Sequence, residues 1–221
     1  SKEQRIYIVV ASTVVISFTA AFYNLGVPLE TLIAVYSEWL HLIVRWVHII
    51  VGVAWIGTSF YFNWLDSRLE RDDPDFKHLD GYLWSVHSGG FYRIEKLKGP
   101  PKKLPKVLHW FKWEAYATWI SGFVLLILVY YLNASSMMLG ASGIILTPFQ
   151  AILISIFLLI GSWLLYDYLC KNVLKDNEQT LIATGVLLFV LLSYFLTQIY
   201  GSRAAYIHVG AIIGTIMAAN V

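Results

Sequence analysis

The sequence is poor in charged residues and contains a single cysteine. Asp, Glu, Lys and Arg make up 14% of the 221 residues, against about 25% in an ordinary globular protein. So few charges cannot cover the surface of a water-soluble domain of this length. The lone Cys170 excludes an internal disulfide and the Cys-x-x-Cys-His motif that attaches c-type haem. We therefore expect no c-type haem on these residues.

The chain is correspondingly rich in apolar and aromatic residues. The chain is 58% hydrophobic and 16% aromatic, whereas soluble domains are about 45–50% apolar. Tryptophan and tyrosine gather where membrane helices meet the headgroup layers. The composition predicts an all-α polytopic membrane protein.

Five apolar runs reach the length of about 20 residues that crosses a hydrocarbon core of about 30 Å. A sixth begins near Arg203 and stops at Val221, and this ending inside an apolar run suggests a truncated chain. The first run lacks the small-residue cleavage site of a signal peptide, so we expect it to be a retained helix. About six transmembrane helices are thus predicted, over residues 6–26, 38–65, 109–132, 148–169, 180–200 and 203–221.

Basic residues concentrate on alternate connections, which sets the orientation of a membrane protein. The 66–108 connection carries nine Lys and Arg residues, whereas the 27–37 connection carries none. Lys171 and Lys175 follow the fourth run, and only Arg203 breaks the alternation. This distribution predicts a multi-pass membrane protein with the N-terminus and the 66–108 loop in the cytoplasm.

The long loop has structure of its own. Its stretch YLWSVHSGGFYRIEKL alternates apolar and polar residues around Ser88, Gly89 and Gly90, which predicts a small β-hairpin. His78 and His87 offer two imidazoles without a cysteine, too little for a zinc site. We expect both to be ordinary loop residues. We find no nucleic-acid module, and the basic loop serves as a topology signal.

The second run carries a polar stripe within HLIVRWVHIIVGVAWIG. Residues spaced three or four apart share one helical face, and an intramembrane Arg or His usually faces the protein interior. His48 lies about 15 Å below the start of the run at 1.5 Å per residue, near mid-membrane. A glycine one turn further on would let a flat group approach, so a haem site is predicted here. The stripe comprises His41, Arg45, His48, Gly52, Trp55, Ser59 and Asn63.

The two histidines of the stripe cannot bind one iron, because His41 and His48 are about 10.5 Å apart along the axis. By depth, His208 in YIHVGAIIG is the best second ligand. Gly210 and Gly214 form a GxxxG pattern that permits close approach, and plain helix packing would explain that pattern equally well. The simpler alternative for the stripe is that His48 hydrogen-bonds another helix while Arg45 pairs with an acid such as Glu38.

A second cluster, HWFKWEAYATW, opens the third run. Its tryptophans and Lys112 are typical of an interfacial belt, in which the lysine extends its ammonium toward water. Glu114 points into the run and should pair with Lys112 or with Arg93. A carboxylate beside a lysine and His109 can move protons, so Glu114 and Lys112 are catalytic candidates together with Arg45.

Four stretches carry a family resemblance: RWVHIIVGVAWIGTSFYFNWLD, LWSVHSGGFYRIEK, LHWFKWEAYATWISGF and YIHVGAIIGTIMAANV. Together they resemble the membrane domain of bacterial membrane-bound urate hydroxylases, also called urate oxidases, in which a cytochrome c domain follows the spans. The resemblance covers residues 38–221 and leaves 1–37 as an extra first helix with its outer connection. The stretch VHIIVGVAWIG is also similar, more distantly, to membrane protoporphyrinogen oxidases, in which a histidine on such a helix binds haem b.

The resemblance implies oxidation of urate to 5-hydroxyisourate, with electrons passed to a c-type cytochrome. The more distant resemblance implies a haem b bound by His48, while Arg45 suits an anionic group, either a haem propionate or urate itself. The alternative is a non-catalytic or haem-binding subunit of a larger respiratory or photosynthetic redox complex. The expected partners are therefore a cytochrome or other redox subunit, urate or another purine, and lipid, with no nucleic acid.

Overall fold

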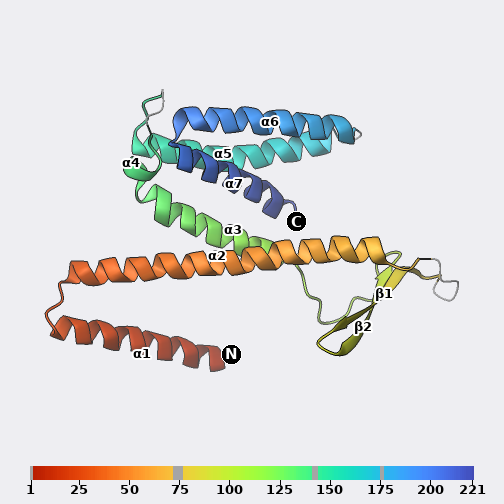
Figure 1. Ribbon diagram of the computed structural model, residues 1–221, viewed down its shortest axis with the longest axis horizontal. Coiled ribbons are helices and arrows are strands. Elements are labelled where there is room, and N and C mark those ends of the chain that lie inside the picture. The colour runs from red at the N-terminus through yellow and green to blue at the C-terminus, as the bar shows by residue number, and fades with distance from the viewer. Residues whose placement is uncertain (1, 72–76, 141–143, 175–176) are drawn as a thin grey trace.

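The computed structural model describes residues 2–71, 77–140, 144–174 and 177–221, and most of them are helical (Figure 1). Lys175, one of the charges used to predict orientation, and residues 72–76 of the long connection lie outside this description. The elements in chain order are α1 (Lys2–Asn24), α2 (Leu29–Arg68), β1 (Leu79–His87), β2 (Gly90–Leu97), α3 (Lys112–Leu125), the π-helix η2 (Leu126–Tyr131), α4 (Ala134–Met137), α5 (Pro148–Tyr168), the π-helix η3 (Leu169–Val173), α6 (Glu178–Ile199) and α7 (Ser202–Ala219).

The long helices match the predicted apolar runs in number and position, with one exception. Among the described residues, five helices are long and apolar enough to cross a membrane, namely α2, α3 with η2, α5 with η3, α6 and α7. In α1 the apolar stretch covers Ile8–Asn24 among the residues searched. The predicted helical class and the small hairpin are confirmed.

Helix α2 begins earlier than the sequence pattern predicted. The expected 27–37 connection is wrong, because the helix starts at Leu29 directly after Pro28 and continues for 40 residues to Arg68. Proline fits the start of a helix, where its missing N–H is not needed, and Glu30 favours the first turn. At 1.5 Å per residue α2 is about 60 Å long, roughly twice the thickness of a hydrocarbon core.

The hairpin closes where the sequence predicted and is tied to the end of α2. Ser88 and Gly89 both have positive φ, at 51° and 79°, as a two-residue hairpin turn of type I′ requires. The Lys96 ammonium donates to the Asp66 carboxylate at the end of α2 and lies 3.2 Å from Asp80. These hydrogen bonds, first to Asp66 and then to Asp80, raise the pKa of Lys96.

The buried core lies among α3, η2, α5, α6 and α7, while α2 packs against this group through α3 (Figure 1). Met138, Tyr200 and Ile212 are each at most 2% exposed and belong to this core. Helix α1 lies beside the first half of α2, where Thr19 and Tyr36 share a hydrogen bond of 2.6 Å. Because α2 touches the core group mainly through α3, a space remains between α2 and α7.

Candidate functional site

A cavity of about 690 Å³ lies between α2, α3 and α7, with Leu159 of α5 and Phe189 of α6 closing part of its wall. Its lining extends over residues 118–130 on one side and 203–215 on the other. Each stretch covers about 18 Å of helix axis at 1.5 Å per residue, so the cavity is elongated. The volume falls within the range of about 300–1,000 Å³ that is typical of ligand sites.

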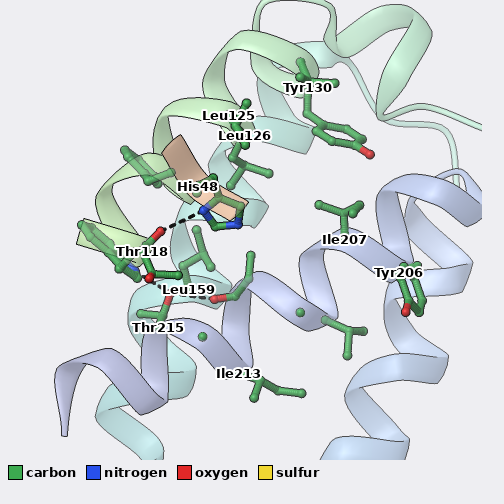
Figure 2. A pocket seen from close by; sticks show the side chains of 18 of the residues that line it. His48, Thr118, Leu125, Leu126, Tyr130, Leu159, Tyr206, Ile207, Ile213 and Thr215 are labelled. Carbon is green, nitrogen blue, oxygen red and sulfur yellow. Dashed lines mark hydrogen bonds between the residues drawn. The ribbon is translucent and has the colours of Figure 1, made fainter. Parts of the chain in front are cut away.

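His48 projects from α2 into this cavity (Figure 2). Its Nδ1 lies 3.1 Å from the carbonyl oxygen of Thr118 and 3.1 Å from the Ser121 hydroxyl oxygen. A carbonyl oxygen only accepts hydrogen bonds, so Nδ1 carries the proton in the neutral ring. The lone pair is then on Nε2, where it can bind a metal or accept a proton. The predicted hydrogen bond to another helix is present, and it leaves one nitrogen free for chemistry.

The glycine that accommodates His48 is on the facing helix. A Cβ added at Gly122 of α3 would come within 2.9 Å of His48 Cε1. Non-bonded carbon atoms do not approach each other so closely. Gly52, the glycine expected to admit a flat group, has a different environment, because its Cβ would meet Thr118 Cγ2 at an ordinary 3.8 Å. Gly52 is also absent from the described lining of the cavity. Its predicted part in cofactor binding therefore has no support from this packing.

Arg45 lines the same cavity one helical turn before His48. Its predicted alternative partner, Glu38, forms no ion pair with it in the described part of the chain. His41, Glu38 and Arg45 border a second, shallow groove along α2. His41 is absent from the described lining of the larger cavity, which agrees with its expected separation from His48.

His208 is buried apart from His48. It is 1% exposed, its Nδ1 donates to the carbonyl oxygen of Ala204 at 2.7 Å, and its ring centroid lies 4.6 Å from that of Tyr200. Its Nε2 has no hydrogen-bond partner among the described residues. Because His208 does not line the cavity in this described structure, the two imidazoles predicted to share one iron do not meet there.

The GxxxG pattern of α7 borders the cavity. A Cβ at Gly210 or at Gly214 would meet nothing within 4 Å, so neither glycine brings a second helix into close contact. Both line the cavity instead. No helix in the described part of the chain packs against this pattern, and the two glycines leave room for an occupant.

Glu114 pairs with a residue that precedes its helix. Its Oε1 lies 3.0 Å from His109 Nε2, because the helix begins at Lys112 rather than at His109 and leaves that histidine free to fold back. The other oxygen, Oε2, is buried without a partner among the described residues. Glu114 is absent from the described lining of the cavity. It lies one helical turn before Thr118, which is a lining residue.

The two predicted partners of Glu114 are engaged elsewhere. The Lys112 ammonium lies 4.8 Å from the centroid of the Trp110 ring and 5.6 Å from that of Trp113, in cation–π contacts typical of an interfacial belt. Arg93 lies 3.1 Å from the carboxylate of Glu95 in the hairpin. Both predicted pairings are wrong. Lys112 is also absent from the cavity lining among the described residues, so no contact there supports a catalytic part for it.

Sequence reasoning missed several residues of the cavity. Trp119 Nε1 donates to Thr215 Oγ1 at 2.9 Å and joins α3 to α7 at one end. Tyr130, on η2, and Arg203, in the first turn of α7, lie toward the other end. Arg203 had a detectable signal, since it is the one basic residue that breaks the charge alternation.

A comparison with protein families identifies a relationship over most of the chain. The family model described as urate oxidase N-terminal matches residues 34–221. The match starts within α2, so every residue that lines the cavity falls inside it and α1 falls outside. The curated proteins and the solved structures gave no match.

Proposed function

The chain belongs to the urate oxidase N-terminal family, and from this premise we propose that it oxidises urate to 5-hydroxyisourate in a bacterial inner membrane. Five long apolar helices in the described structure support a membrane location. The basic residues around the hairpin support a cytoplasmic N-terminus and a cytoplasmic 66–108 loop. Labelling of a cysteine in the 66–108 loop of intact cells tests this orientation.

One observation carries the catalytic proposal: His48 and Arg45 face one cavity of ligand size. In the reaction, urate and water give 5-hydroxyisourate with the release of two protons and two electrons. Thr118 and Ser121 hold the ring of His48 in place through Nδ1, which leaves Nε2 for the redox group that takes the electrons. Arg45 supplies a planar cation that suits an anionic ligand.

The electrons require a redox group, because no side chain in the cavity accepts and returns them in this chemistry. The donor set fits one haem b, since His48 Nε2 is a free imidazole ligand and Gly210 and Gly214 leave space on the opposite wall. Bound there, haem would supply reversible one-electron chemistry. The described lining offers no second histidine, methionine or cysteine. We therefore propose one imidazole ligand from this cavity and a c-type cytochrome as the electron acceptor.

Purified protein with a c-type cytochrome tests this proposal. Urate absorption should fall while the cytochrome is reduced, with two cytochromes reduced for each urate lost. Arg45→Gln should remove most turnover, and Arg45→Lys should restore part of it. Arg68→Gln is the control, since that arginine is at the end of the same helix and is absent from the described lining of the cavity. Normal turnover in Arg45→Gln would leave urate oxidation standing and take Arg45 out of the site.

A second candidate, a haem-binding or structural subunit of a larger redox complex, is favoured by the surface of α2. Its most apolar stretch has none of its residues buried inside the protein, and Trp39 and Trp46 are 58% and 68% exposed. Such a face suits a membrane partner as well as it suits lipid. A protein that carries b-type haem but never consumes urate would favour this candidate.

A further inference from the structure

Two arginines and no acidic residue line the cavity in the described structure. Arg45 lines it from α2 and Arg203 lines it from α7, whereas no Asp or Glu occurs among its described lining residues. Neither arginine takes part in an ion pair within the part of the chain that the structure describes. Since guanidinium groups stay protonated at all relevant pH values, both bring a full charge to the cavity.

The position of Arg203 is unfavourable for a cation by itself. The positive end of the helix dipole favours acidic residues in the first turn, and α2, α3 and α6 each carry a glutamate there. Helix α7 has no acidic residue in its first turn and carries Arg203 instead. An anionic ligand would compensate both this repulsion and the charge of Arg45.

The walls of the cavity suit a flat ring. Trp55, Phe123 and Phe189 line them from three different helices, and apolar surroundings strengthen a charge–charge interaction. Each guanidinium presents a planar set of donors that matches a planar anion. Because the arginines come from separate helices, a bound ring can be held from two sides.

We infer that Arg45 and Arg203 together form a binding site for a planar organic anion, and that Arg203 is a recognition residue for urate. The second part rests on the proposed function. An oxygen-bearing anionic group is common to urate and to the propionates of a haem, so the two sources must be separated experimentally.

Equilibrium dialysis of the full chain with radiolabelled urate, without an electron acceptor, tests this inference. Arg203→Gln should weaken urate binding by at least about tenfold, since a charged hydrogen bond contributes about 1.5–3 kcal/mol and each 1.4 kcal/mol is a factor of ten. Arg203→Lys should recover part of the loss. Arg68→Gln should bind urate as the unsubstituted protein does.

Two further readouts separate recognition of the anion from a structural effect. Hypoxanthine, an uncharged purine, should compete poorly with urate in the unsubstituted protein and clearly better in Arg203→Gln, where only Arg45 still favours the anion. Haem content, measured on the same samples, should not change with Arg203→Gln.

Each outcome decides something. Unchanged urate affinity, unchanged selectivity and unchanged haem content in Arg203→Gln would overturn the inference. Loss of haem with unchanged urate affinity in the remaining holoprotein would support the anion site and overturn its assignment to urate. Strong urate binding that depends on Arg203, in a protein that never oxidises urate, would support the inference and refute the proposed function.

Discussion

Replacing Gly122 by alanine should disturb the site more than its small size suggests. The new Cβ would lie 2.9 Å from Cε1 and 3.4 Å from Nδ1 of His48. The ring cannot yield freely, because its Nδ1 is hydrogen-bonded to Thr118 and Ser121 on the same side. We expect the imidazole to be pushed outward and both hydrogen bonds to lengthen or break.

The size of the effect follows from two opposing contributions. Overpacking costs about 1–3 kcal/mol, while alanine in place of a helical glycine gains about 1 kcal/mol. Gly57→Ala in α2 receives the same gain without the clash, because a Cβ there meets nothing within 4 Å. The free energy of unfolding should therefore be about 1–3 kcal/mol lower in Gly122→Ala than in Gly57→Ala.

Reversible unfolding in mixed micelles measures this difference, and a double-mutant cycle with His48→Ala assigns its cause. Without the imidazole, Gly122→Ala should behave like Gly57→Ala, so the coupling energy should match the overpacking cost. Gly52→Ala should also be tolerated, because its Cβ meets Thr118 Cγ2 at an ordinary 3.8 Å. If Gly122→Ala is as stable as Gly57→Ala, His48 does not approach α3 as closely as this contact requires.

Three other predictions concern the core, the hairpin and the orientation. Tyr131→Phe should lower the free energy of unfolding by about 1–3 kcal/mol, since it removes the hydroxyl that lies 2.6 Å from the buried Ser155 hydroxyl. Tyr23→Phe, at a 70% exposed position, is the control and should have no effect in the same assay. Docking of the hairpin on α2, followed with a spin label on β2, should persist from neutral pH up to pH 10.5 and weaken above it, because the raised pKa of Lys96 keeps its ammonium charged beyond the ordinary value of 10.5. Loosening between neutral pH and pH 10.5 would contradict this, and the hairpin of Lys96→Met should be mobile throughout. A cysteine at Lys102 in a Cys170→Ser background should resist an impermeant reagent until cells are lysed, and labelling of intact cells would reverse the proposed orientation.

Local patterns predicted the elements well because their causes are local. The turn at Ser88 and Gly89 follows from backbone conformations that few residues adopt. The apolar runs identified the long helices, since length and hydropathy are properties of the segment itself. The start of α2 was missed, although Pro28 signals it and the Val27–Ser37 segment is mostly apolar.

The parts of the site that depend on packing could not be predicted from one sequence. Depth in the membrane gives a position along the axis of α7, but it does not say which side of the helix faces α2. His208 and His48 were therefore paired by depth, whereas the structure turns His208 toward Tyr130 and Tyr200. Gly122 was missed for a related reason. Its importance depends on contact with His48, which belongs to another helix more than seventy residues earlier in the chain.

The most direct test of the central claim is an anaerobic difference spectrum of the oxidised, purified full chain after addition of urate alone. We predict that urate itself produces the bands of a reduced b-type haem in the unsubstituted protein and in Arg68→Gln, and that these bands are absent in His48→Ala. Full reduction by dithionite but none by urate would contradict the claim that this cavity is the site of urate oxidation.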